Sequence, residues 1–274
     1  MTMSILFVGG GNMASALVGG LLAHGQPREE IAVVEVNISV ARDFHARWGV
    51  TTVSAIPENL EGISTLVLAV KPQQIPGVLH GCPALSDTVR VISIAAGVTT
   101  QQLSQGLRGH GNIVRAMPNT PALVRAGVTG LFAREGVSQE DRDHATALMH
   151  AVGSVHWLDQ EAQMDALTAI SGSGPAYVFL LMEALQRAAE SQGFDAHTAQ
   201  ALVEETVRGA ALLACSGHED PGVLRQRVTS PGGTTAAAVR VLEEGQWFSL
   251  VGQAVAAATQ RSRELAQVDG GAAK

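Results

Sequence analysis

The segment Ile5-Leu6-Phe7-Val8-Gly9-Gly10-Gly11-Asn12-Met13-Ala14-Ser15-Ala16-Leu17 decides the fold of this chain. Four apolar residues predict a buried strand, and the residues after the glycines have helical periodicity. In the pattern Gly9-x-Gly11-x-x-Ala14, the first glycine permits a tight turn and the second lets a pyrophosphate approach the backbone. The alanine lets the helix pack closely on the strand. The segment therefore predicts a dinucleotide-binding turn made by Gly9, Gly11, Asn12, Met13 and Ala14.

Strands and helices alternate over the first 160 residues. The helix after the glycines is expected to reach about His24 and to stop at Gly25. Continuous apolar runs separated by helices predict a parallel sheet covered on both faces. We expect further strands at residues 31–36, 50–53, 65–70, 89–94, 113–117, 128–132 and 155–158, and a helix starting at Ser138. Residues 1–160 are thus predicted to form a Rossmann-type dinucleotide-binding domain of the α/β class.

Turn-forming residues follow several of these apolar runs. Ligands of parallel sheets bind outside the carboxyl ends of the strands, so these residues are expected to surround one crevice with the glycine turn. For Asn119, which stands between two prolines, the alternative to a coenzyme contact is an ordinary turn. For Lys71, which follows a predicted strand, the alternative is a solvated side chain, with only the backbone at the coenzyme. The residues expected at the coenzyme are Ala69, Val70, Lys71, Pro72, Ala95, Gly97 and Asn119.

From residue 161 the pattern changes to helices alone. Apolar residues from Leu202 to Ala214 follow the helical period, and Asp195 can cap that helix. Asp220-Pro221 is an N-cap followed by proline at the first helical position. The apolar faces are too many for one small core. We therefore expect an all-helical domain over residues 161–274 that pairs with a second copy, which makes the protein at least a dimer.

A second glycine-rich turn precedes one of these helices, in Val228-Thr229-Ser230-Pro231-Gly232-Gly233-Thr234-Thr235-Ala236-Ala237-Ala238-Val239. Such a turn leaves backbone N–H groups unpaired, and the helix behind it adds its positive end. This arrangement favours a small anion, a carboxylate as readily as a phosphate. In the alternative interpretation, a Thr234 or Thr235 hydroxyl simply caps the first turn of the helix.

Composition excludes several classes of function. The formal net charge is −7 and the 18 lysines and arginines are scattered, so no nucleic-acid surface is expected. Cys82 and Cys215 have no CxxC partner and the nine histidines form no HExxH pattern, so neither a disulfide framework nor a metal site is expected. The longest uncharged stretch, residues 166–182, contains glycines and a proline, so no membrane span is predicted. Without a recognisable signal peptide, the expectation is a cytoplasmic enzyme.

The motifs together resemble the pyrroline-5-carboxylate reductase family over essentially the whole chain. The residues that carry the resemblance are Gly9–Ala14, Ala69–Gln73, Ser93–Gly97, Arg115–Pro121, Ser171–Tyr177 and Val228–Val239. The resemblance implies that the chain reduces 1-pyrroline-5-carboxylate to L-proline, the last step of proline biosynthesis, by hydride transfer from NAD(P)H. The alternative is another NAD(P)-dependent two-domain dehydrogenase, acting on a hydroxy acid or a different cyclic imine. That alternative needs a catalytic lysine or histidine in the helical half, where no lysine precedes Lys274.

The resemblance also implies roles for the second turn. By similarity the Thr235 hydroxyl faces the ring nitrogen of the substrate and stabilises or supplies its proton. The substrate carboxylate is expected on the backbone amides of the turn, as charge-assisted hydrogen bonds. The residues expected to bind substrate are Val228, Ser230, Gly232, Gly233 and Thr234. If Thr235 is only a helix cap, it has no part in the chemistry.

The choice of coenzyme depends on the loop after residue 34. Glu35 is near the position of the acidic residue that bonds the ribose 2′-OH in NAD enzymes. Asn37, Ser39 and Arg42 follow it, and the resemblance implies that small polar residues in this loop hold a 2′-phosphate. We expect NADP(H), with Asn37 among the coenzyme contacts and NAD(H) as the alternative.

Overall fold

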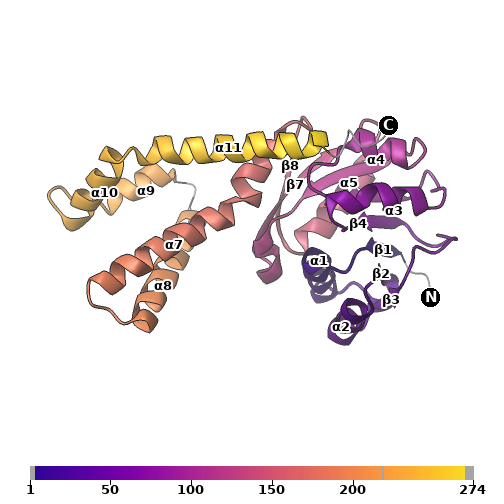
Figure 1. The fold of residues 1–274 in the computed structure, drawn as a ribbon, viewed down its shortest axis with the longest axis horizontal. Coiled ribbons are helices and arrows are strands. Elements are labelled where there is room, and N and C mark those ends of the chain that lie inside the picture. The colour runs from indigo at the N-terminus through magenta and orange to yellow at the C-terminus, as the bar shows by residue number, and fades with distance from the viewer. Residues whose placement is uncertain (1–3, 218, 269–274) are drawn as a thin grey trace. The chain divides into compact units, whose positions relative to one another are not determined.

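The computed structural model describes residues 4–217 and 219–268 (Figure 1). The pattern of spatial contacts between residues divides the chain into two compact units. One consists of Met1–Ser173 together with Ala258–Lys274, and the other of Gly174–Ala257. We call them the sheet unit and the helical unit and describe each by itself.

The sheet unit is built on one eight-stranded sheet with the strand order β3-β2-β1-β4-β5-β6-β7-β8. Neighbours from β3 through to β6 pair in parallel. Their bounds are β1 (Ile5–Val8), β2 (Ile31–Val34), β3 (Thr51–Val53), β4 (Thr65–Leu68), β5 (Arg90–Ser93), β6 (Ile113–Met117), β7 (Gly127–Ala133) and β8 (Gly153–Trp157). Every predicted strand is present. The runs expected at 31–36 and 65–70 end two residues earlier, at Val34 and Leu68, before the chain turns away from the sheet.

One part of the sheet differs from the prediction. Strand β7 is antiparallel to β6, whereas β8 pairs with β7 in parallel. The prediction of a wholly parallel sheet is therefore wrong at β7. The connection between Met117 and Gly127 contains only the short 3₁₀ helix η3 (Thr120–Val124). A parallel return needs a crossover of a dozen residues or more, so this connection can only reverse the chain.

Helices cover both faces of the sheet and enclose two cores. Phe7, Leu17 and Met149 belong to the core on one face, and Leu6, Ile75 and Leu103 to the core on the other. The helices of this unit are α1 (Asn12–Ala23), α2 (Ile38–Trp48), α3 (Ile75–Gly81), α4 (Thr100–Gly106), α5 (Gln139–His150) and α6 (Gln163–Leu167), with the 3₁₀ helices η1 (Arg28–Glu30) and η2 (Pro72–Gln74). A π-helix, η4 (Thr168–Gly172), continues α6 to the end of the unit.

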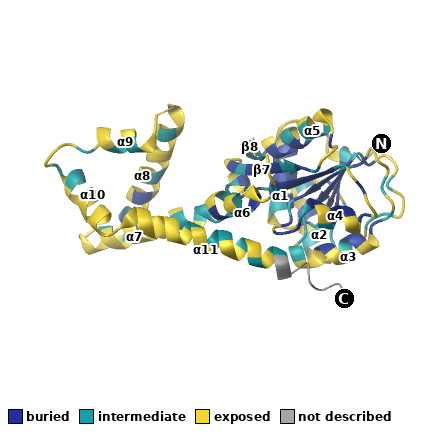
Figure 2. Cartoon of the chain, turned by 90° about the horizontal axis from the view of Figure 1, so that it is seen from above, coloured by how far each residue is buried: buried dark blue, intermediate teal, exposed yellow. Residues whose placement is uncertain are grey.

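The helical unit contains little buried surface of its own. It comprises α7 (Gly174–Ser191), α8 (Ala196–Ser216), α9 (Pro221–Arg227), α10 (Thr234–Glu244) and the first part of α11 (Trp247–Val268). The predicted caps are confirmed, because the Asp195 and Asp220 carboxylates accept backbone N–H groups at the starts of α8 and α9. Among its described residues only Ala199 and Val203 are buried. Figure 2 shows the contrast, with buried strands in dark blue and largely exposed helices in yellow.

No helix among residues 4–217 and 219–268 has both the length and the apolarity needed to cross a membrane.

Candidate coenzyme and substrate sites

The glycine turn after β1 has the conformation that a dinucleotide needs. Gly9 has φ of +107°, and a Cβ there would lie 2.6 Å from the Ala69 carbonyl oxygen, so only glycine fits. A Cβ built on Gly11 would meet no atom within 4 Å, which leaves the space in front of this residue open. Helix α1 begins at Asn12, and its first N–H groups have no partner within the helix. The turn therefore fits a pyrophosphate approaching the end of a helix.

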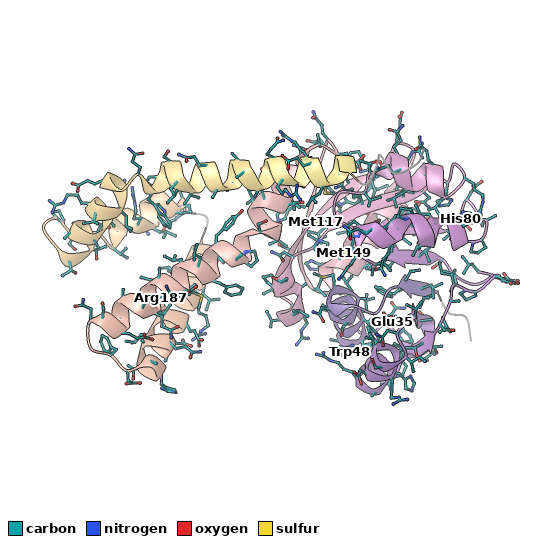
Figure 3. All side chains as sticks on the ribbon, in the orientation of Figure 1. Glu35, Trp48, His80, Met117, Met149 and Arg187 are labelled. Atoms are coloured by element: carbon teal, nitrogen blue, oxygen red, sulfur yellow. The ribbon has the colours of Figure 1, made fainter. Side chains whose placement is uncertain are left out.

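A cleft of about 460 Å³ opens beside this turn. It brings together five of the predicted coenzyme residues with the end of β2, where Glu35 lies (Figure 3). The predicted residues that line the cleft are Gly9, Gly11, Ala69, Val70 and Lys71. Residues that were not predicted also line it, namely Gly10, the loop at 54–56 and one side of α3. Their signal in the sequence is weak, because small and apolar residues in loops carry no chemistry of their own.

Other predicted coenzyme residues lie next to the cleft without lining it. Asn12, Met13 and Ala14 form the first turn of α1, and Pro72 follows Lys71 at the start of η2. Ala95 and Gly97 follow β5, which pairs in parallel with β4 and so ends at the same edge of the sheet. A Cβ on Gly97 would lie 3.4 Å from the Cα of Ala266 in α11, so the last part of α11 packs on this turn.

Asn119 is buried and both ends of its amide have protein partners. Its Oδ1 accepts the Val128 N–H at 2.8 Å, and its Nδ2 donates to the Ser171 carbonyl at 3.0 Å. The side chain thus joins the end of β6 to the start of β7 and to the π-helix. The expected contact of Asn119 with the nicotinamide stays a prediction, and the structure gives the amide group a holding role that the sequence did not reveal.

The loop after β2 is organised by Glu35. Its Oε2 accepts the Gly10 N–H at 2.9 Å and its Oε1 accepts the Asn37 N–H at 2.8 Å. Asn37 is the N-cap of α2, because its Oδ1 accepts the N–H groups of Ser39 and Val40 and the Ser39 hydroxyl. No ion pair of Arg42 occurs among the residues that the structure describes. The Asn37 oxygen is therefore already bonded within the chain, and its contact with the coenzyme stays a prediction.

The second glycine-rich turn leads into α10. Gly233 is the N-cap of this helix, so the alternative in which a Thr234 or Thr235 hydroxyl is the cap is wrong. Gly232 has φ of +72°, and the Gly233 N–H donates to the Ser230 carbonyl at 3.0 Å within the turn. The N–H groups of Thr234 and Thr235 stand in the first turn of α10, where the helix offers them no acceptor. A small anion can bind these groups beside the positive end of the helix.

In the described part of the chain, no three histidine, cysteine or acidic side chains are grouped so that they could hold a metal ion.

Two family models match the chain. The model described as "Pyrroline-5-carboxylate reductase dimerisation" matches residues 161–265. The model described as "NADP oxidoreductase coenzyme F420-dependent" matches residues 4–97, which contain the glycine turn and the cleft.

Curated relatives match almost the full length. The chain is 43% identical over 267 residues to the pyrroline-5-carboxylate reductase of Pseudomonas aeruginosa, covering 97% of this chain and 98% of the relative. It is 44% identical to the enzyme of the same name from Pasteurella multocida, covering 96% and 97% of the two chains.

Solved structures agree with the relatives. A pyrroline-5-carboxylate reductase from Coxiella burnetii has a TM-score of 0.88 at 45% identity, covering 97% of this chain and 99% of that one. The Plasmodium falciparum pyrroline carboxylate reductase with NADP bound has a TM-score of 0.83 at 29% identity, covering 96% and 98%.

Proposed function

The chain belongs to the pyrroline-5-carboxylate reductase family, and on that premise we propose that it reduces 1-pyrroline-5-carboxylate to L-proline. It is an oxidoreductase that uses NADP(H). When bound, the reduced nicotinamide supplies the hydride that the C=N carbon of the substrate accepts. The observation that carries the assignment is the 43–44% identity to enzymes of this name over 96–97% of the chain. Each unit also contains a glycine-rich turn whose backbone can bind an anion.

In this proposal the coenzyme binds at the glycine turn and in the cleft beside it. Gly9 and Gly11 leave the backbone free to approach the pyrophosphate, and the start of α1 stabilises its charge. Ala69, Val70 and Lys71 also line this cleft. Pro72, Ala95, Gly97 and Asn119 complete the proposed coenzyme site from the neighbouring strand ends.

The substrate belongs to the turn before α10. The backbone N–H groups of Ser230, Gly232 and Thr234 donate to the substrate carboxylate. Pro231 has no N–H, and that of Gly233 already donates to the Ser230 carbonyl. Charge-assisted hydrogen bonds of this kind contribute roughly 1.5–3 kcal/mol each. The Thr235 hydroxyl then bonds the ring nitrogen and stabilises or supplies the proton that this nitrogen gains while the carbon gains hydride. Val228 and Gly232 shape the same turn.

The helical unit is proposed to pair with a second copy, so that the protein is at least a dimer. The dimerisation model matches residues 161–265, and this part of the chain exposes most of its large apolar side chains. They include Phe179, Leu180, Leu212, Leu213, Leu242, Phe248 and Leu250. Apolar surface on this scale marks an interface.

We also propose that the functional boundary between the domains lies at residues 160 and 161. The start of the dimerisation match at residue 161 supports it. A cytoplasmic location stays a prediction.

The test of the substrate site is removal of the Thr235 hydroxyl. Thr235→Val keeps the shape of the side chain, and we expect kcat/KM for 1-pyrroline-5-carboxylate to fall roughly 10²–10³-fold, the scale of a single preorganised polar group. NADPH affinity should barely change, because the dinucleotide turn lies in the other unit. Thr235→Ser should keep most of the activity.

Two outcomes would count against this assignment. Normal turnover by Thr235→Val with a lowered melting temperature would reduce Thr235 to a structural residue. Wild-type protein that oxidises NADPH with hydroxy acids but not with pyrroline-5-carboxylate would favour the other two-domain dehydrogenases.

A further inference from the structure

The carboxylate of Glu35 joins the pyrophosphate turn to the loop after β2. One oxygen accepts the N–H of Gly10 in the pyrophosphate turn, and the other accepts the N–H of Asn37 in the loop that leads into α2, at 2.9 and 2.8 Å. A Cβ on Gly10 would lie 3.2 Å from Oε2, so this carboxylate packs directly on the glycine turn. Its position is therefore fixed from both sides, and the group lines the cleft.

A carboxylate fixed in this way keeps capacity for a ligand. Each oxygen has two lone pairs, and the chain uses one on each. The remaining lone pairs can accept a hydroxyl of a ribose, which is the role of an acidic residue at the end of the second strand. The same negative charge repels a phosphate attached at the ribose 2′ position, which carries nearly two negative charges at neutral pH.

The groups available to counter this repulsion are few. The Ser39 hydroxyl donates a hydrogen bond to the Asn37 side-chain oxygen, and the N–H groups of Ser39 and Val40 at the start of α2 donate to the same oxygen. Arg42, which is exposed, lies in α2 directly after this loop, and Lys71 is the cation that lines the cleft itself. Attraction by one exposed arginine is partly screened by solvent. Glu35 thus presents a fixed negative charge, and Arg42 in α2 presents an opposing, solvent-exposed positive charge.

We propose that Glu35 determines coenzyme specificity by limiting the preference for the 2′-phosphate, so that the protein binds NADH as well as NADPH. Glu35 favours the free ribose hydroxyl and Arg42 favours the phosphate, and their balance sets the ratio of the two affinities. The proposal rests on the nicotinamide coenzyme use proposed above.

The experiment measures binding without turnover. Isothermal titration gives the dissociation constants of ADP-ribose and 2′-phospho-ADP-ribose for the wild-type protein, Glu35→Gln and Arg42→Ala. Glu29→Gln, at an exposed position in η1, is the matched control. We expect Glu35→Gln to shift the ratio of the two constants toward the phosphorylated ligand by about tenfold. Arg42→Ala should shift it the opposite way, and Glu29→Gln should leave it unchanged.

The ratio separates the charge of Glu35 from its hold on the backbone. Loss of the hydrogen bond from the Gly10 or Asn37 N–H weakens the binding of both ligands equally and leaves the ratio of their dissociation constants unchanged. Glu35→Asp retains the charge and should retain the wild-type ratio even if both affinities fall. A ratio that does not move in Glu35→Gln, or wild-type protein that binds only the phosphorylated ligand, overturns the role of Glu35. Wild-type protein that binds neither ligand overturns the proposed coenzyme use itself.

Discussion

The two units of this chain bury their apolar side chains to very different extents. In the sheet unit, Phe7 and Leu66 are completely inaccessible to solvent. In the helical unit, Phe179 is 63% exposed and Leu213 57% exposed. The first unit has cores on both faces of its sheet and can be stable by itself. The second exposes the surface that a core would cover, so we infer that its stability depends on association.

A matched pair of phenylalanine substitutions tests this difference most strongly. Phe7→Ala in β1 should lower the free energy of unfolding by roughly 3–5 kcal/mol at every protein concentration, because it leaves a cavity inside one chain. Phe179→Ala in α7 should also destabilise, but through the interface, so its effect on the melting temperature should grow as the protein is diluted. Thermal melts and light scattering over a range of concentrations measure both effects.

One combination of results would contradict the inference that the helical unit depends on association for its stability. A truly exposed phenylalanine changes stability by no more than about 0.5 kcal/mol when it is truncated. If Phe179→Ala has so small an effect and the wild-type protein scatters light as a monomer at micromolar concentration, the helical unit is stable without a partner. Leu123→Ala, at an exposed position of the sheet unit, is the control for truncation of a surface side chain.

A smaller effect is expected at Asn119, whose side chain holds the π-helix η4 against the sheet. Asn119→Asp keeps an oxygen for the Val128 N–H but removes the donor to the Ser171 carbonyl. We expect a loss of about 1–3 kcal/mol in chemical denaturation, the cost of an unsatisfied buried group. The same variant tests the proposed coenzyme contact of Asn119, because an NADPH affinity close to that of the wild type would limit the side chain to its hydrogen bonds within the chain. A change of more than about tenfold (1.4 kcal/mol) in NADPH affinity would instead place the side chain on the coenzyme.

The smallest effect concerns pH and belongs to the sheet unit alone. Burial lowers the pKa of His144, the nearby Arg90 lowers it further, and Asp141 and Glu140 oppose the shift. The ring accepts or donates a hydrogen bond with the Thr65 hydroxyl at 2.9 Å. Because the unfolded chain binds the proton more readily, this contribution to stability is present above about pH 6.5 and is lost as the pH falls below it.

Melting temperatures of the wild type and of His144→Gln between pH 8 and 5 measure this contribution. The decline on acidification should be shallower in the variant. Parallel curves for the two proteins would show that His144 does not contribute to the acid sensitivity.

The sequence predicted the order and type of the elements well, because burial on both faces of a parallel sheet requires continuous apolar runs. It failed at β7, where the direction of a strand depends on the length of its connection rather than on its own residues. It located the two turns through their glycines. It did not predict the hydrogen bonds of Glu35 with Gly10 or of Asn119 with Ser171. These bonds join residues far apart in sequence, and a pattern of polar and apolar residues does not show which partner a polar side chain has.

Helix α11 has a consequence for the way the protein is made. Its last part belongs to the sheet unit, where the Ser262 hydroxyl donates to Asp165 at 2.7 Å and Ala266 packs on Gly97. Domains of a growing chain generally fold as units, beginning with the N-terminal one. Here the ribosome must synthesise the entire helical unit before the turn at Gly97 receives its cover. A nascent chain released after Ser173 would therefore carry all the strands and still lack part of the sheet unit.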